Sequence, residues 1–469
     1  MDINEDTLDL YKNYEVNVTL GENGNRFAGT LTLTPKAITL KVMGETREGR
    51  SYPDFWNDVD KLICNDINKT FILHNLRATR GVSRAIDSYP ENIGYFEREY
   101  SVDFVVFVPT DHFYDEKCFN LIDIKSKSIS RWIGTTKKQQ KIIDIYGKRE
   151  SIFESGELLN QLSLLIDDGS YLSISYNLST HFSSPEFSAG LSFPPSLTLY
   201  FNKTINSSNI KSKYDEIYTL LAFFISNDFE VERITLGYDF YGRKCEGMLY
   251  FPVQNTLPKH DQGYDFFPLG VDLAFDSLCL PEVSTNYLNN YFCMDNKHKG
   301  HFHKFLKYRR LQNPEEQFLG FFRILESLCY KTKNHLDSEL LSDVIQRSKP
   351  YLKKKFKDTK GVNSFLRGLP RYNQSKYNTE KCLQDFYTQI PTDTSDEWSV
   401  SKNDIASVCR LRNDLTHAND FYIEEHDLYK KTKFIEVLLV IAMGMKLDIP
   451  VTDLCSVIHR LPGYHIITK

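Results

Sequence analysis

Apolar and polar residues alternate in short runs over about the first 280 residues of the chain. The run at 14–20 is the clearest, and further runs follow at 37–42, 102–108, 172–176 and 197–201. Alternation with a period of two predicts strands with one buried face. Turn-forming residues separate the runs, as at 21–25 and 167–169. Many short strands without long helices between them favour antiparallel sheets.

The apolar spacing becomes helical after about residue 312. Asn313 and Pro314 form a helix start, because an N-cap residue is followed by proline at the first helical position. One earlier helix is predicted inside the β-rich part, where Ser212 and Asp215 resemble a capping box. Helices are predicted from 313 and at about 336–358, 379–389, 401–419, 426–446 and 451–460, which gives a bundle of five or six.

These patterns predict an α+β multidomain fold, with an N-terminal antiparallel β-rich region and a C-terminal all-α helical bundle. At 469 residues the chain is longer than a single hydrophobic core supports. We place the β-rich region at 1–290 and the bundle at 305–469. A second subdomain of mixed character is expected to begin near residue 150, although no linker marks that boundary.

The composition is that of an ordinary globular protein, with 41% hydrophobic and 25% charged residues. The acidic first residues contain no readable signal or transit peptide. The longest apolar run, 434–445, contains Glu436 and is too short to span a bilayer. Nine single cysteines without a Cys-x-x-Cys pair predict reduced thiols. We therefore expect a cytoplasmic protein with no membrane partner.

Charge is distributed unevenly along the chain. Residues 301–469 contain 27 Lys and Arg against 21 Asp and Glu, a net charge of +6, whereas the remainder contains 30 against 41, a net charge of −11. A polyanion is therefore expected to bind the C-terminal part. The most basic segment, 349–376, holds nine Lys or Arg against Asp358.

Aromatic residues are interleaved with the cations of this basic segment. Lysines can bind backbone phosphates while rings stack on bases, so the segment is a candidate RNA track. An exposed basic helix face above core aromatics is an equally good interpretation. The candidate substrate-binding residues are Lys353, Lys354, Lys355 and Lys357, and the interleaved rings are Tyr351, Phe356, Phe365, Tyr372 and Tyr377.

Arg412, Asn413 and His417 place a cation, an amide and an imidazole within one and a half turns of a predicted helix. Arg412 and His417 lie about 140° apart around the axis, so they would converge best on a substrate held against a second surface. A guanidinium can bind a phosphate bidentately and an imidazole can transfer a proton near neutral pH, which suits RNA cleavage without a metal. The buried face of this helix is predicted to contain Ile405, Val408, Leu411 and Leu415.

A purely structural interpretation of the same residues is also open. Arg412 would then pair with a carboxylate such as Asp414 or Glu326, and His417 would cap the helix end. Glu326, on the first bundle helix, could instead orient Arg412 or His417, although a surface salt bridge is the simpler expectation.

The segment resembles the HEPN family, whose motif is Arg, a polar residue, three variable residues and His on a helix of a small bundle. Arg412, Asn413 and His417 match that motif in order. A β-rich region before such a bundle is similar to the ApeA-like family of prokaryotic anti-phage defence proteins. The resemblance implies a metal-independent endoribonuclease of abortive infection, without a cofactor, that acts as a homodimer or higher homo-oligomer with two motifs facing one cleft.

Under this hypothesis RNA is the substrate. Arg412 binds the phosphate, His417 acts as general acid or base, and Asn413 positions one of them. The β-rich region contains no phosphate loop, dinucleotide fingerprint or nucleophile elbow. We interpret it as a region that senses a phage-derived trigger or restrains the nuclease.

Two other functions are weighed against this one. The bundle could be a non-catalytic RNA-binding or protein-interaction module. A nucleotidyltransferase partner, as in HEPN toxin pairs, is disfavoured because the chain already carries a large region of its own.

A metal site is the last candidate. Four residues within eleven positions could bind zinc, but their spacing matches no known zinc knuckle, and a surface loop without metal is the preferred interpretation. These residues are Cys293, His298, His301 and His303.

Overall fold

The computed structural model divides into two compact units, residues 1–296 (unit 1) and 297–469 (unit 2). The expected domain bounds, 1–290 and 305–469, remain predictions. The residues that the structure describes are 7–22, 25–46, 56–85, 94–110, 113, 118–148, 157–183, 188–253, 264–275, 280–376, 378–417 and 422–469.

Unit 1 is built on a 13-stranded sheet in the order β4-β1-β2-β3-β6-β5-β7-β15-β14-β8-β13-β10-β9, whose register pairings are all antiparallel. The strands are β1 (Tyr14–Glu22), β2 (Asn25–Leu33), β3 (Ile38–Thr46), β4 (Val59–Asp66), β5 (Lys69–Ala85), β6 (Gly94–Val102), β7 (Phe104–Val108), β8 (Phe119–Lys125), β9 (Asn160–Leu165), β10 (Tyr171–Tyr176), β13 (Pro195–Ile205), β14 (Arg233–Phe240) and β15 (Arg243–Tyr250), while β11 (Ser179–Ser183) and β12 (Ser188–Ser192) form a separate pair.

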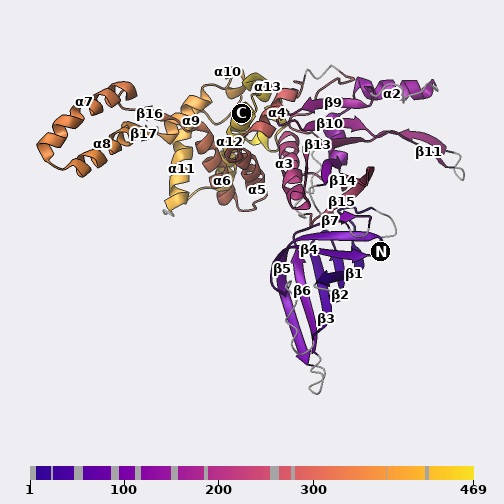
Figure 1. The fold of residues 1–469 in the computed structure, drawn as a ribbon. Coiled ribbons are helices and arrows are strands. Elements are labelled where there is room, and N and C mark those ends of the chain that lie inside the picture. Colours follow the sequence, from indigo (N-terminus) through magenta and orange to yellow (C-terminus); the bar gives the residue numbers. More distant parts are fainter. Residues whose placement is uncertain are drawn as a thin grey trace. The chain divides into compact units, whose positions relative to one another are not determined.

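The sheet closes on itself at one end, because β4 pairs with both β1 and β5. Beyond β5 it continues through β7 into an open half, and Figure 1 shows the strands of the closed half as the indigo group. Strands from both sides of residue 150 share this sheet, since β7 pairs with β15 and β8 pairs with β13 and β14. The antiparallel β-rich prediction is confirmed. The turn predicted at 21–25 lies partly outside the described residues.

In the described part of unit 1, four α-helices accompany the strands: α1 (Lys127–Ile133), α2 (Lys137–Gly147), α3 (Ser207–Ile225) and α4 (Thr285–Cys293). The sequence predicted only the third of these, and its predicted start was wrong. Helix α3 begins at Ser207, whereas Ser212 lies exposed inside it. The apolar spacing reaches back to Ile210, which is fully buried, so packing against the sheet extends the helix beyond the apparent capping box.

The described residues of unit 2 are helical apart from one short β-ribbon. Its helices are α5 (Asn296–Arg309, which begins at the boundary), α6 (Pro314–Cys329), α7 (Ser338–Phe356), α8 (Thr359–Asn373), α9 (Thr379–Tyr387), α10 (Thr392–Ser395), α11 (Ile405–His417), α12 (Glu425–Lys446) and α13 (Val451–Val457), with 3-10 turns at Lys402–Asp404, Ile458–Arg460 and Tyr464–Ile466, and a ribbon of β16 (Thr332–Asn334) and β17 (Gln374–Lys376). The predicted all-α bundle is confirmed.

Helices α6 and α12 form the centre of unit 2. Asn313 caps α6 as predicted, because its side chain accepts the backbone N–H groups of Glu315 and Glu316 at 2.9 and 3.3 Å. Helix α12 is buried almost all round, and it carries Glu436, which is only 3% exposed. Lys433 and Arg309 pair with this carboxylate at 2.7 and 3.2 Å. No helix among the described residues is long and apolar enough to cross a membrane.

Three of the helices that the structure describes in unit 2 were not predicted: α5, α8 and the short α10. Helix α8 contains Gly361, Gly368 and Pro370, and glycine and proline have the lowest helix propensities. Its apolar spacing still places Val362 and Leu366 in buried positions, and α8 packs along α7. The segment 293–303, interpreted above as a surface loop, starts at the last residue of α4 and continues into α5, so that interpretation was wrong.

Candidate functional site

Helix α11 presents the motif residues as the apolar spacing predicted. Its start is fixed by Ser401 and Asp404, since the Asp404 carboxylate accepts the Ser401 backbone N–H at 2.7 Å. Asn413 and His417 are exposed, and Arg412 is half-buried at the edge of the packed face. On that packed face Ile405, Val408 and Leu411 are buried and Leu415 is half-buried.

The guanidinium of Arg412 is held from two directions. One terminal nitrogen donates to the carboxylate of Glu326 on α6 at 3.0 Å, and the other donates to the amide oxygen of Asn413 at 2.9 Å. The guanidinium carbon also lies 5.6 Å from the ring centroid of Phe322, a cation–π distance. Because a guanidinium has five N–H donors, these contacts orient Arg412 and leave donors for an anion.

Glu326 is itself fixed by a neighbouring helix. Its second carboxylate oxygen accepts the hydroxyl of Thr379, at the start of α9, at 2.8 Å. The side chains of Glu326 and Arg412 are 16% and 29% exposed, so their ion pair is partly shielded and differs from the simple surface salt bridge expected. Hydrogen bonds from Thr379 to Glu326 and from Arg412 to Glu326 therefore join α9, α6 and α11. The bond from Arg412 to Asn413 extends this network along α11. Thr379 and Phe322 carry no motif in the sequence, and only the packing of helices brings them here.

His417 is the last residue of α11 and is exposed to solvent. Among the residues that the structure describes, it has no hydrogen-bond partner. An accessible imidazole beside a helix end suits proton transfer to a bound substrate and equally suits a favourable contact with the helix dipole. His417 thus lies exposed at the end of α11, five residues after Arg412.

Cys409 lies one turn before Arg412 on the same helix. Burial, reinforced by the nearby carboxylates of Glu380 and Glu326, raises the pKa of this thiol to about 12. The thiol is therefore protonated near neutral pH and is a poor nucleophile.

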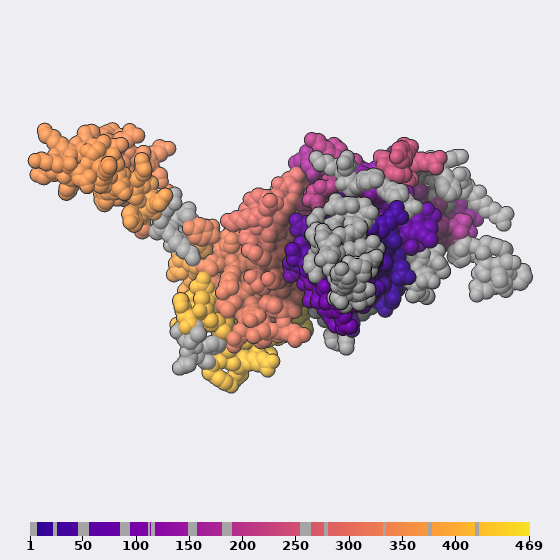
Figure 2. All heavy atoms as spheres, turned by 60° about the horizontal axis from the view of Figure 1, so that its bottom comes forward, coloured from indigo at the N-terminus to yellow at the C-terminus, as the bar shows by residue number. Residues whose placement is uncertain are grey.

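The predicted basic track lies on a hairpin made by α7 and α8. Lys357 ends α7 in a left-handed conformation, with a φ of 53°, and this sharp reversal brings α8 back along α7. Lys354, Lys355 and Lys357 are exposed and Lys353 is half-buried. In both views the hairpin stands out from the other helices of unit 2 and is drawn in orange (Figures 1 and 2).

The base of the hairpin is fastened by Asn373. Its side chain accepts the Leu336 backbone N–H at 2.8 Å and donates to the Leu336 carbonyl at 2.9 Å. These two bonds join the start of the hairpin to its end, beside the β16–β17 ribbon. The two ends of the hairpin are therefore held together at its base.

The aromatic residues of the track are on the surface. Tyr351, Phe356, Phe365 and Tyr372 are 60% to 78% exposed, which rules out the core-aromatic interpretation for these four. Tyr377 lies outside the described residues. Exposed rings beside exposed ammonium groups are the combination that single-stranded nucleic acids bind.

The four candidate zinc ligands do not form a site. Cys293 ends α4, where its thiol contacts the carboxylate of Asp167 at 3.5 Å. His298, His301 and His303 lie on α5. Within the described parts of the chain, no group of three or more His, Cys, Asp or Glu residues is arranged to hold a metal ion.

Comparison with known families agrees with the division of the chain into a β-rich unit 1 and a helical unit 2. The bundle that carries Arg412 and His417 is a HEPN domain, because residues 319–453 match the family model described as Apea-like HEPN. Residues 13–283, more than half of the chain, match the model described as ApeA N-terminal domain 1. The chain therefore belongs to the ApeA family, and the two matches support its assignment to the anti-phage defence HEPN proteins. No curated protein and no solved structure matches the chain.

Proposed function

We propose that this chain is a metal-independent endoribonuclease of anti-phage defence, with the reaction carried by Arg412 and His417. The observation that supports it most is the geometry at Arg412: its guanidinium is oriented by Glu326 and Asn413 and keeps further N–H donors, and the same helix exposes the imidazole of His417. A guanidinium held in this way is suited to a phosphate, because a fixed fork of N–H donors binds two phosphate oxygens at once.

The reaction proceeds by attack of the ribose 2′-hydroxyl on the adjacent phosphorus. An imidazole takes the 2′-hydroxyl proton as the O2′–P bond forms, the P–O5′ bond breaks, and the leaving 5′-oxygen receives a proton. Arg412 offsets the negative charge that develops on the phosphate oxygens. His417 performs one proton transfer, and Asn413 holds Arg412 in place through its amide oxygen.

Two proton transfers on opposite sides of one phosphorus need two groups. Arg412 and His417 lie about 140° apart around one helix, so a second copy of α11 facing the first would supply the other imidazole. We propose a homodimer or higher homo-oligomer through the HEPN domain, with RNA held between the two motifs.

The α7–α8 hairpin would hold the RNA strand. Lys353, Lys354, Lys355 and Lys357 neutralise phosphates, and the exposed rings stack on bases without sequence preference. Unit 1 would then regulate the nuclease, either by sensing a phage-derived signal or by restraining its activity.

The Arg412–Glu326 ion pair also fits a bundle that binds RNA or a protein without cutting. Incubation of the purified full chain with total RNA in excess chelator separates the two functions. Cleavage in chelator supports the nuclease. If the protein binds RNA but the RNA stays intact at every protein concentration, the nuclease hypothesis is wrong and the bundle is a binding module.

A further inference from the structure

A cavity of about 280 Å³ lies in unit 1, where β13 leaves its sheet. Strand β13 pairs with β8 up to Tyr200, and the pairing resumes only at Ile205, opposite Phe119. Its pairing with β10 also ends at Tyr200. The residues between are released from the ladder and border the cavity together with the β9–β10 turn, α3 and α4. Irregularities of this kind re-aim side chains and are frequent next to functional sites.

Hydrogen bonds join the walls of this cavity to one another. The Asn202 side chain on β13 donates to the Asp168 carbonyl in the β9–β10 turn at 2.9 Å. The Asp167 backbone N–H in the same turn donates to Asn289 on α4 at 3.2 Å. The Tyr291 hydroxyl on α4 donates to a main-chain carbonyl of α3 at 3.1 Å. The cavity is therefore formed before any ligand arrives, which lowers the entropic cost of binding.

Gly169 shows how closely the turn fits against β13. Its φ is +83°, in the left-handed region, and a Cβ at this position would lie 2.6 Å from the side-chain nitrogen of Asn202. A residue with a side chain would be strained and would push Asn202 away. The close approach brings Asp168 to the mouth of the cavity.

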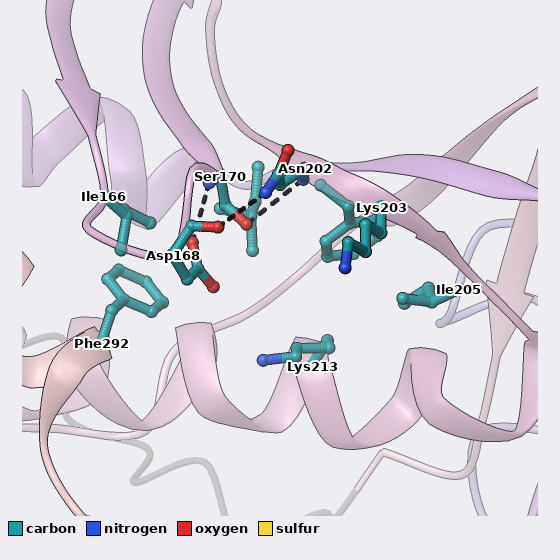
Figure 3. A pocket seen from close by; sticks show the side chains of 10 residues that line it. Ile166, Asp168, Ser170, Asn202, Lys203, Ile205, Lys213 and Phe292 are labelled. Atoms are coloured by element: carbon teal, nitrogen blue, oxygen red, sulfur yellow. Dashed lines mark hydrogen bonds between the residues drawn. The ribbon is translucent and has the colours of Figure 1, made fainter.

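The groups that face the cavity are chemically mixed. Figure 3 shows the amino groups of Lys203 and Lys213 directed into the space between the turn and α3, with the carboxylate of Asp168 opposite them. The ring of Phe292 and the aliphatic side chain of Ile166 lie together at one end. The Lys213 amino group also pairs with the Glu216 carboxylate on α3 at 3.0 Å, and one Asp168 carboxylate oxygen accepts the Ser170 backbone N–H at 2.8 Å. The site thus offers the Lys203 cation, a Lys213 ammonium held in place by Glu216 with further N–H donors, the second carboxylate oxygen of Asp168, and an apolar surface with an aromatic ring.

We propose that this cavity binds a nucleoside monophosphate. The phosphate would lie between Lys203 and Lys213, a ribose hydroxyl would donate to Asp168, and the base would pack on Phe292. Carboxylates bind ribose hydroxyls and aromatic rings bind bases in this way in other nucleotide sites.

Two features narrow the ligand to this class. A bare inorganic anion would gain from the lysines but would be repelled by Asp168 and would leave the apolar end empty. The volume lies at the lower limit of ligand pockets, which begin at about 300 Å³, and so suits one nucleotide better than a dinucleotide. The inference assigns a ligand class to unit 1 and does not depend on whether unit 2 cuts RNA.

Isothermal titration calorimetry of the purified full chain with AMP and with UMP tests the proposal. We expect a Kd below about 1 mM for at least one of them. Lys203→Gln and Lys213→Gln should each weaken binding about tenfold or more, since each removes a charge-assisted contact. Phe292→Leu keeps the apolar volume but removes the ring, and should weaken binding about fivefold or more. Lys127→Gln, a 90% exposed lysine on α1, is the matched control and should bind normally.

Three results would overturn the proposal: no binding of either nucleotide at millimolar concentration, unchanged binding in both lysine variants, or inorganic phosphate binding as tightly as AMP. Thermal denaturation of each variant shows that the fold is kept. The same phosphate and base chemistry also occurs at the end of an RNA strand. Competition by a 5′-phosphorylated trinucleotide, abolished in Lys203→Gln, would identify a strand end as the ligand, and binding of the mononucleotide without such competition would identify a free nucleotide.

Discussion

Arg412 on α11 donates a hydrogen bond to Glu326 on α6 at 3.0 Å. The two residues are 86 positions apart, so packing of the helices creates a contact that no local motif encodes. This pairing and phosphate binding are compatible, because the ion pair uses one face of the guanidinium fork and fixes its direction.

Replacing Glu326 with Gln should therefore impair cleavage without unfolding the bundle. The neutral amide still accepts the Thr379 hydroxyl but no longer holds the guanidinium by charge, and misplacement by about 1 Å costs up to about 10²-fold in rate. We expect kcat to fall more than RNA affinity, as measured with a fluorescent oligonucleotide. Glu339→Gln, an exposed acid at the start of α7, is the control. Equal rates in wild type and Glu326→Gln would mean that Glu326 does not position Arg412.

The sequence predicted much of this surface because helical spacing determines which side of α11 faces solvent. Ile405, Val408 and Leu411 recur at three-residue intervals and are buried, which left Asn413 and His417 exposed as expected. The partners of Arg412 could not be ranked, since Asp414 and Glu326 were equally suitable carboxylates by charge.

Helix α8 and the irregularity of β13 were not predicted because both depend on contacts with other elements of the fold. Gly361, Gly368 and Pro370 lower the helix propensity of α8, but packing along α7 outweighs that cost. In unit 1, the bulge of β13 depends on its pairing with β8 across a long sequence separation, and alternation within β13 cannot reveal where pairing stops.

Substituting Lys353, Lys354, Lys355 and Lys357 together with Gln should weaken RNA binding and reduce its salt dependence. Removing one lysine–phosphate interaction should change the slope of log K against log salt by about 0.7 for a single strand. Fluorescence anisotropy at several salt concentrations measures this slope. Lys304→Gln, exposed on α5, provides a charge control. An unchanged slope would show that the α7–α8 hairpin does not contact RNA.

Glu436 should make the stability of unit 2 pH-dependent. Burial raises the pKa of this carboxyl, but the charges of Lys433 and Arg309 outweigh burial and hold it below its usual value. Because the folded pKa is the lower one, the stabilisation is present above the unfolded value of about 4.3 and disappears as the pH falls through the folded pKa.

Glu436→Gln should destabilise unit 2 by about 3–5 kcal/mol at neutral pH, since two cations stay buried without their carboxylate. The difference from wild type should shrink as the pH drops below about 4. Thermal denaturation across this pH range measures both effects, with the exposed Glu397→Gln as control. A constant difference at every pH would contradict the ion-pair explanation.

Mixing wild-type and His417→Ala chains should lower the activity more than dilution does. If one cleft needs an imidazole from each copy, mixed dimers are impaired and the rate falls with the square of the wild-type fraction. To measure the rate against the wild-type fraction, the two proteins are mixed in varying ratios and left to exchange subunits. The mixtures are then assayed at constant total protein concentration. A straight line through the origin would mean that each copy cuts independently.

Cleavage by His417→Ala tests the central claim most directly. His417 is exposed, so its removal should leave the melting temperature unchanged, while loss of a general acid or base should lower the rate about 10²- to 10⁴-fold. His303→Ala, an exposed histidine on α5, should cleave RNA at the wild-type rate. We predict RNA cleavage in chelator by wild type and His303→Ala, and none above background by His417→Ala. A folded His417→Ala chain that cuts RNA as fast as wild type would contradict the proposed mechanism.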